Sequence, residues 1–484
     1  MLRTWIKEVT EKIGDDAELF GWVDNRRDHG KLIFIDLRDR TGICQVVFGP
    51  WSGKELYEQA QKLRSEWVIK VSGLVKERPE NMINKNILTG TVEVEAKSIE
   101  IFNDELATPA PPFDVTTDGR DLNEEIRMKY RYLDLRRPRM QKNLDLRYKV
   151  IKFIRDFLGE YKFIEVETPI LTKSTPEGAR DYVVPSRLYP GKFFALPQSP
   201  QQYKQLLMVA GVERYFQIAR CFRYEDTRGD RQPEFTQLDL EMSFVEREDV
   251  MDLNEKLLID LVKTCAPEKK IQQIPFPRLT YKEAMEKYGT DRPDLREDKN
   301  DPNLMAFCWV IDFPFFEKTS DGGWTFTHNP FSNPQEGESL DIYKKYLIKK
   351  LNNNKEMLSE KDIASILTAQ YDIVLNGLEV GGGSIRAYQP LVLGLTLGIM
   401  GYREEEIKEK FGHMLKALSY APPHGGIAWG LDRLVTLLSN EPNIREVIAF
   451  PKTGDARDLM MDAPSELEKK QLEELHIEIK KSKK

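Results

Sequence analysis

The chain is poor in cysteine and has no long apolar run. Its four cysteines, Cys44, Cys221, Cys265 and Cys308, are scattered over 484 residues and form no C-x-x-C pair. Neither a disulfide framework nor a zinc site is indicated, and a reducing cytoplasm is the expected compartment. No apolar stretch approaches the roughly 20 residues that span a bilayer. The N-terminal residues lack the apolar core of a signal peptide.

Three common signatures of nucleotide or acyl chemistry are also missing. The sequence contains no GxxxxGK[ST], no GxGxxG between a strand and a helix, and no GxSxG. These absences argue against a P-loop, a dinucleotide-binding fold and a serine hydrolase of the α/β type. Any nucleotide must therefore be held in another way.

The composition is that of a folded protein with several cores. Hydrophobic residues make up 40% of the chain and charged residues 31%, with a formal net charge of −7. At about 150 residues per domain, this length predicts two to four domains. A mildly acidic total does not exclude a nucleic-acid partner, because a local basic patch decides such binding.

Residues 1–104 read as β-rich runs separated by turn residues. Five strands, with a helical stretch between the third and the fourth, predict an OB-type barrel. In the second strand, alternation puts Ile33, Ile35 and Leu37 on the core face and Phe34 on the other. Two interpretations of Phe34 remain open: an aromatic half buried at a barrel edge, or a platform on which an unpaired base stacks.

Residues 105–136 are expected to form a linker. Three prolines, Pro109, Pro111 and Pro112, predict a semi-rigid segment. A strongly basic stretch, 127–147, follows; it is typical of a solvated helix face, and the functional alternative is a connector that faces an RNA backbone. From 137 to 484 helices and strands mix, beginning with an amphipathic helix and a strand ended by Pro169, so the whole chain is predicted to be α+β.

The segment from Phe222 to Met242 predicts a highly charged β-hairpin. Arg223 and Glu225 end the first strand, and alternation in the second puts Phe235 on the same face as Asp239. An exposed hairpin covered with ion pairs would explain the charge, but it would not explain an aromatic residue on the polar face. A site in which an aromatic side chain stacks on a ligand ring and charged side chains bind a phosphate explains both the charge and the aromatic residue.

A second group of residues follows a glycine run. Asp372 and Glu379 could chelate a hard cation such as Mg²⁺, which prefers a few carboxylates together with phosphate oxygens. Gly381, Gly382 and Gly383 allow close backbone approach, and Arg386 offers a fork for a carboxylate or phosphate. The alternative is a bulged strand with a surface arginine.

Two further groups are weaker. Arg433 is expected near a helix start, where an anion is favoured, but an ordinary surface arginine is equally credible. Glu177, Gln201 and Lys204 could contact an amino acid, the carboxylate meeting an ammonium group and the lysine an anionic side chain. Each of them is also a common surface residue.

Taken together, these segments resemble the class II aminoacyl-tRNA synthetases, and in particular the bacterial-type aspartyl-tRNA synthetases. Motif 1 is expected near 146–170, motif 2 ("FRYE", then "RQPEF") near 214–244, and motif 3 ("GLDR") near 425–438. The resemblance also rests on "TPEGARDY", "QSPQQYK", "FTQLDLEMSF", "EVGGGSIR" and "HNPF". It covers nearly the whole chain and implies an antiparallel catalytic sheet flanked by helices over 137–484, with the barrel as anticodon-binding domain.

The resemblance implies ATP-dependent ligation of L-aspartate to tRNA through an aspartyl-adenylate, with Mg²⁺, in a cytoplasmic homodimer. Arg223, Glu225 and Arg433 would be catalytic. The residues expected to bind ATP are Arg223, Glu225, Gln232, Phe235, Glu379, Gly430, Leu431, Asp432 and Arg433; those expected to bind aspartate are Glu177, Ser199, Gln201, Lys204, Arg223, Asp239, His328 and Arg386. Asp372 and Glu379 would carry the metal, and Arg27, His29, Phe34 and Gln45 would contact the anticodon.

The sequence departs from the family's usual pattern in one respect and is ambiguous in another. The large domain commonly inserted between motifs 2 and 3 is expected to be absent, because a short connector follows Thr290. His29 favours an enzyme that also charges tRNA(Asn), whereas Asn81 favours tRNA(Asp) alone; on balance we expect the relaxed specificity.

Two other functions are compatible with parts of the sequence. An amide ligase that makes asparagine from aspartyl-adenylate would lack the N-terminal barrel, which this chain has. A non-catalytic RNA-binding protein would not need Arg223, Glu379 and Arg433, which are all present.

Overall fold

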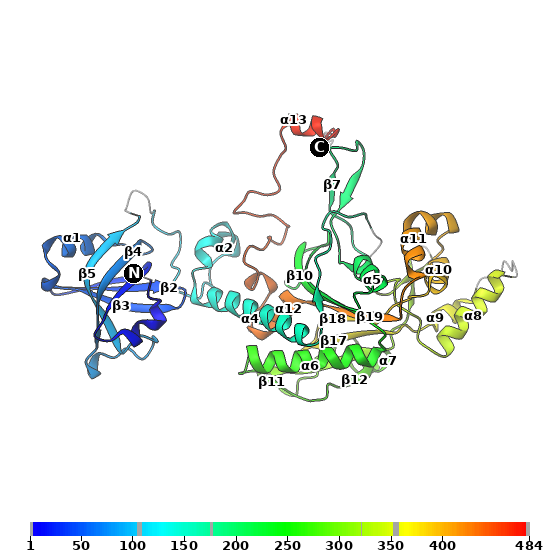
Figure 1. Ribbon diagram of the computed structural model, residues 1–484, viewed down its shortest axis with the longest axis horizontal. Helices are drawn as coiled ribbons and strands as arrows, with labels where there is room; N and C mark the ends of the chain where they lie inside the picture. The colour runs from blue at the N-terminus through cyan, green and yellow to red at the C-terminus, as the bar shows by residue number, and fades with distance from the viewer. Residues whose placement is uncertain (1–2, 104–108, 175–177, 321, 352–357, 481–484) are drawn as a thin grey trace. The chain divides into compact units, whose positions relative to one another are not determined.

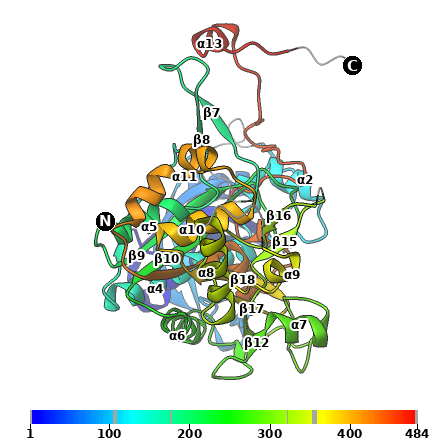
Figure 2. The same cartoon turned by 90° about the vertical axis from the view of Figure 1, so that its right-hand side faces the viewer.

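The computed structural model describes residues 3–103, 109–174, 178–320, 322–351 and 358–480, and it divides into two compact units, residues 1–141 and 142–484. Figures 1 and 2 show the chain from two directions, and each unit is described by itself. No helix in the described part of the chain is long and apolar enough to cross a membrane.

The first unit contains a closed five-stranded barrel in the order β1-β2-β3-β5-β4, as the strand spacing predicts. Its regular elements are β1 (Asp16–His29), β2 (Leu32–Asp39), β3 (Gly42–Phe48), α1 (Lys54–Lys62), β4 (Val68–Glu77), β5 (Val92–Ile101), α2 (Glu124–Lys129) and α3 (Arg131–Asp134). Ile33, Ile35 and Leu37 of β2 are buried in its core, so the predicted alternation is confirmed. Helix α1 lies between β3 and β4 in sequence, where the helical stretch was expected.

Three arginines of the basic stretch that follows the prolines are not on a solvated helix face, so that expectation is wrong for them, whereas Lys129 and Lys142 are exposed. Arg127, Arg131 and Arg137 are buried and all donate to one buried carboxylate, Asp134, at 2.8–3.0 Å. Burial would raise the pKa of Asp134, but the guanidinium of Arg127, helped by the other two, holds it below its ordinary value. Arg137 also donates to the main-chain oxygens of Asp114 and Thr117, each at 2.8 Å, and so fixes the segment after the prolines.

The second unit is built on an eight-stranded sheet in the order β12-β14-β17-β18-β19-β10-β9-β6. The strand pairs are antiparallel except at the two edges, β12 with β14 and β6 with β9. The strands of this sheet are β6 (Ile164–Glu165), β9 (Arg214–Phe222), β10 (Glu234–Ser243), β12 (Arg278–Thr280), β14 (Phe307–Ile311), β17 (Gln370–Leu375), β18 (Leu378–Ile385) and β19 (His424–Gly430).

Helices and short strands surround this sheet. The helices are α4 (Pro138–Glu160), α5 (Gln201–Val209), α6 (Arg247–Cys265), α7 (Tyr281–Tyr288), α8 (Glu338–Leu351), α9 (Glu360–Ala364), α10 (Pro390–Ile399), α11 (Glu404–Leu418), α12 (Leu431–Leu438) and α13 (Lys469–Glu474). The short strands are β7 (Val183–Pro185), β8 (Phe193–Ala195), β11 (Lys270–Ile271), β13 (Leu304–Met305), β15 (Phe316–Lys318) and β16 (Trp324–Phe326). Residues 289–303 connect α7 to β13 directly, where the larger inserted domain was expected to be missing.

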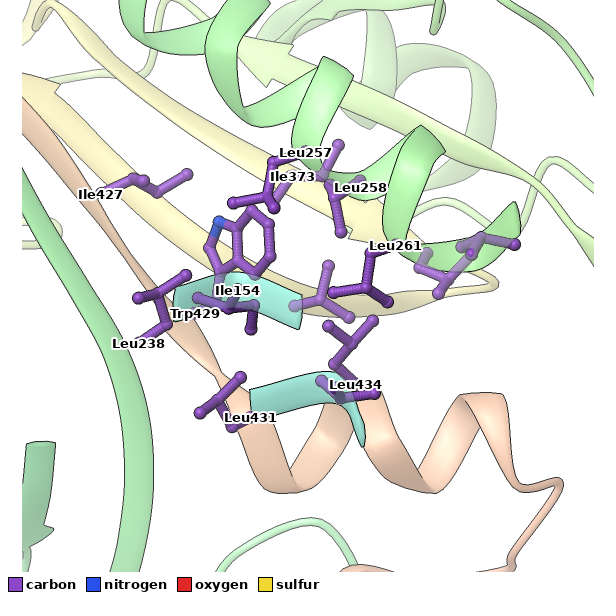
Figure 3. Close-up of a cluster of buried hydrophobic side chains, with 14 of the residues drawn as sticks. Ile154, Leu238, Leu257, Leu258, Leu261, Ile373, Ile427, Trp429, Leu431 and Leu434 are labelled. Carbon is purple, nitrogen blue, oxygen red and sulfur yellow. The ribbon is translucent and has the colours of Figure 1, made fainter. Parts of the chain in front are cut away.

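The main core lies between the sheet and helices α4, α6 and α12. Trp429 of β19 is buried among Leu238, Ile373 and the leucines of α6, as Figure 3 shows. Leu431 and Leu434 of α12 belong to the same cluster. This packing fixes the start of α12 against the sheet, and with it the residues on either side of Leu431.

Candidate active site

A cavity of about 210 Å³ lies where the β9–β10 hairpin meets β18 and the start of α12. Its lining includes nearly all the residues expected to bind ATP: Arg223, Glu225, Gln232, Phe235, Glu379, Gly430, Asp432 and Arg433. The exception is Leu431, whose side chain is fully buried in the core. Residues from four separate parts of the chain therefore meet in one cavity.

Arg223 and Phe235 face each other across the mouth of the hairpin. The guanidinium carbon of Arg223 lies 5.1 Å from the centre of the Phe235 ring, and its Nε donates to the main-chain oxygen of Gln198 at 3.4 Å. Phe235 is paired with Cys221, two residues before Arg223, which follows the last residue of β9. An aromatic face and a guanidinium side by side suit a planar base attached to a phosphate.

Two other predicted ATP ligands already have partners in the protein. Glu225 pairs with Arg231 at 3.1 Å. The amide of Gln232 accepts from the main-chain N–H of Lys452 at 2.7 Å and donates to the same residue's carbonyl at 3.1 Å. The side chain of Gln232 therefore holds the segment at Lys452 in place.

At the start of α12 only part of the "GLDR" segment faces the cavity. Asp432 is buried and accepts from Arg147 at 2.5 Å and from the main-chain N–H of Thr236 at 2.8 Å. Arg433 donates to the main-chain oxygen of Glu379 and to Asp230 at 3.3 Å. Leu431 and Asp432 thus anchor the helix, while Gly430, Asp432 and Arg433 line the cavity.

The two carboxylates expected to bind metal, those of Asp372 and Glu379, lie close to each other beside Gly382. Asp372 of β17 is paired with Gly382 of β18, and a Cβ at Gly382 would lie 2.8 Å from Asp372 Oδ1 and 3.6 Å from Glu379 Oε1. Burial, together with the charge of Glu379, raises the pKa of Asp372 well above its ordinary value. A buried carboxylate that lies beside a second one in this way fits a cation between the two. Among the described residues they have no third ligand from His, Cys, Asp or Glu.

Beside this cavity lies a buried network of two cations and two carboxylates. Arg386 donates through Nε and Nη2 to the two oxygens of Glu241, at 2.8 and 3.0 Å, and through Nη1 to Ser384 at 2.8 Å. Lys204 donates to Asp239 Oδ2 at 2.9 Å and lies 3.4 Å from Glu241. All four charged groups are almost completely buried. Gly426 makes room for Glu241, because a Cβ there would collide with that carboxylate.

The network is completed by polar groups on α5 and β19. Gln201 donates to Gln205 at 3.4 Å, and Gln205 lies 3.2 Å from Nε2 of the buried His424. Nδ1 of His424 donates to the carbonyl of Pro422 at 2.8 Å, so Nε2 accepts from the Gln205 amide and the ring is neutral. Burial accordingly lowers the pKa of His424.

Three residues expected to bind aspartate, Ser199, Arg223 and His328, lie outside this network, and Arg223 lines the ATP cavity instead. The His328 ring packs edge-on against Phe313 at 4.8 Å, and burial lowers its pKa against the opposing charge of Glu379. Ser199 lines a different cavity, on the far side of α5. Glu177 lies outside the described residues.

The structure adds two residues to which the sequence gave no role. Glu241, which lies within the segment "FTQLDLEMSF", is the partner of Arg386. Gln198, one residue before Ser199, is buried and donates to the carbonyl of Ala179 at 2.8 Å and to Asp181 at 2.6 Å. Its main-chain oxygen accepts from Arg223, so Gln198 joins the 179–181 segment to the ATP cavity. A buried glutamine in a motif full of polar residues gives no sequence signal of its own.

The barrel places all four predicted anticodon contacts on one face, where His29 of β1 is opposite Leu32 of β2 and Gln45 of β3 is opposite Asp36. Arg27 of β1 is opposite Phe34 of β2, and it donates to Asp36 at 2.7 Å and to Gln45 of β3 at 3.3 Å. Gln45 donates to Glu93 at 2.9 Å. Phe34 is half-buried, so neither interpretation of this side chain is excluded by its burial. His29 ends β1 and is exposed, as is Asn81 beyond β4.

Family models match both units of the chain. The model of class II tRNA synthetases for D, K and N matches residues 123–454, and that of the OB-fold nucleic acid binding domain matches residues 17–102. Solved structures share the fold at low sequence identity. An asparaginyl-tRNA synthetase from Pyrococcus horikoshii has a TM-score of 0.71 at 23% identity, over 94% of this chain and 98% of that one. An aspartyl tRNA synthetase from Entamoeba histolytica has a TM-score of 0.69 at 22% identity, over 93% and 91%.

Curated relatives match along the full length. The aspartate–tRNA(Asp/Asn) ligase of Caldanaerobacter subterraneus is 41% identical over 96% of both chains. The aspartate–tRNA ligase of Bacillus licheniformis is 39% identical over 98% of both. The first alignment extends over 593 positions, more than the 484 residues present here, so that relative contains residues without a counterpart in this chain.

Proposed function

This chain belongs to the class II tRNA synthetases of the aspartate, lysine and asparagine group, and on that premise we propose that it ligates L-aspartate to tRNA in two ATP-dependent steps. The observation that carries the choice of aspartate is the buried pairing of Lys204 and Arg386 with Asp239 and Glu241 beside the nucleotide cavity. Full-length relatives named as aspartate–tRNA ligases, at about 40% identity, support the same choice.

In the first step an oxygen of the aspartate α-carboxylate attacks the α-phosphorus of ATP. The bond between that phosphorus and the bridging oxygen of pyrophosphate breaks, and aspartyl-adenylate forms. Arg223 would bind the α-phosphate, Phe235 would stack on the adenine, and Glu225 would read its amino group. Arg433, which lines the same cavity and donates to the main-chain oxygen of Glu379, would cover the opposite side of the nucleotide. Positioning and charge neutralisation carry such a reaction, so no protein nucleophile is needed.

Mg²⁺ would be held by Asp372 and Glu379. It would neutralise the charge that gathers on the polyphosphate. Mg²⁺ commonly binds through one or two carboxylates and completes its shell with phosphate oxygens and water, which fits a pair of carboxylates without a third protein ligand among the described residues.

The hydrogen-bond capacity of the network favours aspartate. Asp239 Oδ1 is buried without a hydrogen-bond partner, so it can accept from the substrate ammonium group. Each guanidinium has five N–H groups and each ammonium three, so Arg386 and Lys204 keep donors for the substrate's side-chain carboxylate. An asparagine amide would present an N–H₂ to these donors, and a site built to bind one group rejects the wrong one strongly.

In the second step a hydroxyl of the terminal tRNA ribose attacks the acyl carbon, loses its proton, and AMP leaves. The barrel face of Arg27, Phe34 and Gln45 would contact the anticodon. Both tRNA(Asp) and tRNA(Asn) are proposed substrates, because His29 is present and relatives bearing the Asp/Asn name are among those matched. Asn81 would favour the charging of tRNA(Asp) over that of tRNA(Asn).

We also propose a cytoplasmic homodimer. The large apolar side chains Ile164, Ile170 and Leu171, in the motif 1 segment, are 48–56% exposed, and β6 is an edge strand of the sheet. Exposed apolar side chains beside a strand edge are typical of a protein interface. The cytoplasm supplies ATP and tRNA and keeps thiols such as the four free cysteines reduced.

Aminoacylation assays would test the proposal. Purified protein with ATP and Mg²⁺ is expected to attach labelled aspartate to tRNA(Asp) and, more slowly, to tRNA(Asn). Labelled lysine and asparagine should not be attached to any tRNA. Attachment of either one in place of aspartate would refute the assignment, and charging of tRNA(Asp) alone would refute the relaxed specificity.

A further inference from the structure

Two fully buried polar residues beside the amino-acid network have no part in the proposed reaction. They are Gln205 of α5 and His424, the first residue of β19. Gln205 lies one helical turn beyond Gln201, and both are buried on the side of α5 that also carries Lys204. Since Gln205 is hydrogen-bonded to Gln201, it contacts a side chain that is expected to bind the substrate.

The hydrogen bonds that link these residues run in one direction, and a main-chain carbonyl fixes that direction. The oxygen of Pro422 can only accept, so Nδ1 of His424 donates to it at 2.8 Å. A neutral ring with its proton on Nδ1 can only accept at Nε2, so the Gln205 amide nitrogen, 3.2 Å away, donates to it. The amide oxygen of Gln205 then accepts from the amide nitrogen of Gln201 at 3.4 Å.

The surroundings of His424 keep its ring neutral. Burial disfavours the charged ring and lowers the pKa of His424, and the positive charges of Arg386 and Lys204 act in the same direction. The negative charge of Glu241 and the contact with the Pro422 carbonyl oppose them without reversing the shift. At neutral pH, Nε2 is therefore an acceptor, as the direction of the hydrogen bonds requires.

This chain of hydrogen bonds leaves the oxygen of the Gln201 amide for the substrate. The amide nitrogen of Gln201 is used by Gln205, and Oε1 accepts no hydrogen bond from the residues that the structure describes. A substrate ammonium group has three N–H donors, and Asp239 Oδ1 supplies one buried acceptor without a partner. Gln201 Oε1 supplies a second acceptor as long as the amide is not turned round.

We propose that His424 and Gln205 are positioning residues that fix the orientation of the Gln201 amide, so that its oxygen meets the ammonium group of the amino acid. An amide that is free to turn presents its N–H₂ to that ammonium group in part of the molecules, and two donors then face each other without an acceptor. The proposal rests on the proposed function, because it concerns the binding of the amino-acid substrate.

The direction of the hydrogen bonds is tested without any substrate. The chain has five histidines, so nitrogen-15 labelling of histidine gives few signals, and the spectrum of His424→Gln identifies those of His424. At neutral pH the His424 ring should be uncharged, with its proton on Nδ1. A proton on Nε2, or a charged ring, would overturn the proposal, because Gln205 would then have to accept at His424 and could not accept from Gln201.

The positioning role is tested by the KM for aspartate in pyrophosphate exchange. Gln205→Met keeps the length of the side chain but removes the acceptor for Gln201, and it should raise this KM at least about threefold while the KM for ATP stays the same. Gln202→Met is the matched control on the same helix, where Gln202 accepts from His413 of α11, and it should change neither constant. An unchanged KM for aspartate in Gln205→Met, or an equal rise of both constants, would refute the role.

A second substitution separates the orientation of the amide from its packing. A carboxylate has two equivalent oxygens, so Gln201→Glu presents an acceptor whichever way it turns. In the Gln201→Glu background, Gln205→Met should therefore not raise the KM for aspartate any further. The same rise as in the wild-type background would contradict the proposal.

Failure of the proposed function gives a different result from failure of this proposal. Absence of exchange with aspartate in the wild type would refute the choice of substrate. The same comparison of variants is then made with the amino acid that does support exchange, because every amino-acid substrate carries an α-ammonium group for Gln201. Exchange in the wild type with no effect of Gln205→Met would refute the positioning role alone.

Discussion

At the residue scale, Glu241 shows how the amino-acid pocket is held. Its two oxygens accept from Arg386, and it lies 3.4 Å from Lys204, with all three side chains buried. Burial alone would raise the pKa of Glu241, but the charges of Arg386 and Lys204 hold it below its ordinary value. A carboxylate in this setting stays ionised and positions both cations for a substrate.

Glu241→Gln should therefore destabilise the protein and impair the pocket together. Removing one partner of a buried ion pair costs about 3–5 kcal/mol, and Arg386 would lose its bidentate acceptor. Denaturant unfolding should show this loss, and the KM for aspartate should rise while the KM for ATP changes little. Glu248→Gln, at an exposed pair with Arg247, should cost less than about 1 kcal/mol. Similar losses in the two variants would contradict the account.

His424 predicts a pH dependence of stability. Its pKa lies below the ordinary 6.5 in the folded protein, because burial disfavours the charged ring, and the charges of Arg386 and Lys204 oppose Glu241. The unfolded chain thus takes up a proton more readily, so the contribution is complete above pH about 6.5 and is lost as the pH falls below it.

The melting temperature should fall between pH about 7.5 and about 5.5, and His424→Gln should reduce that fall. It would not abolish it, because burial also lowers the pKa of His328 and His413. An unchanged slope in the variant would show that His424 is not held neutral as described.

Many residues of the site could be predicted from the local sequence pattern. The side chains with which they pair could not. Strand alternation placed Phe235 with Asp239 on one face of β10, and the glycine run predicted close approach at β18. The pairing of Arg386 with Glu241 joins residues 145 positions apart, and no short-range pattern encodes it. The side chain of Leu431, assigned to ATP by resemblance, is buried in the core, whereas Asp432 lines the ATP cavity and also pairs with Arg147.

At the element scale, the short helices α2 and α3 show where the charge pattern of the sequence gave a wrong prediction of burial. A run of arginines is usually solvated, yet three of them surround Asp134, because a buried carboxylate with three guanidinium partners replaces the hydrophobic core that so short a segment cannot build. Arg137 also contacts the main-chain oxygens of Asp114 and Thr117, which lie before the helices in the chain, so its inward position depends on tertiary contacts that local pattern does not show.

Asp134→Asn tests this arrangement. The change leaves three buried guanidinium groups without their common anion, and a cost of about 3–5 kcal/mol is expected. Hydrogen exchange should accelerate in residues 109–140 more than in the catalytic sheet. Asp118→Asn, at an exposed carboxylate of the same segment, is the control and should leave exchange unchanged. Equal protection in Asp134→Asn and the wild type would refute the central role of this carboxylate.

Phe34, on the outer face of β2, allows a test of how the barrel binds tRNA. If Phe34 stacks on an anticodon base, Phe34→Ala should weaken tRNA binding by about 1–3 kcal/mol per lost stack. Pyrophosphate exchange without tRNA should be unaffected, because the barrel takes no part in it. Phe102→Ala, at another exposed aromatic of this unit, is the control and should not alter the KM for tRNA. An unchanged KM in Phe34→Ala would favour the edge-aromatic interpretation.

At the scale of the whole molecule, the chain combines two units with separate tasks. The barrel has its own core and a polar face built on three strands, and the catalytic unit contains the ATP cavity, the carboxylate pair and the buried network. The barrel order was predictable because five short strands and one helix leave few topologies. The helical region α8–α11, with its own core around Phe331 and Phe411, was not, since its helices pack mainly on one another.

The most direct measurement is aspartate-dependent exchange of pyrophosphate into ATP, without tRNA and with Mg²⁺. Exchange is predicted with aspartate and not with asparagine or lysine. Arg223→Ala should lower its rate about 10²–10³-fold, the usual loss when a preorganised charge is removed from a developing anion. Exchange supported by asparagine or lysine in place of aspartate, or a wild-type rate in Arg223→Ala, would contradict the account.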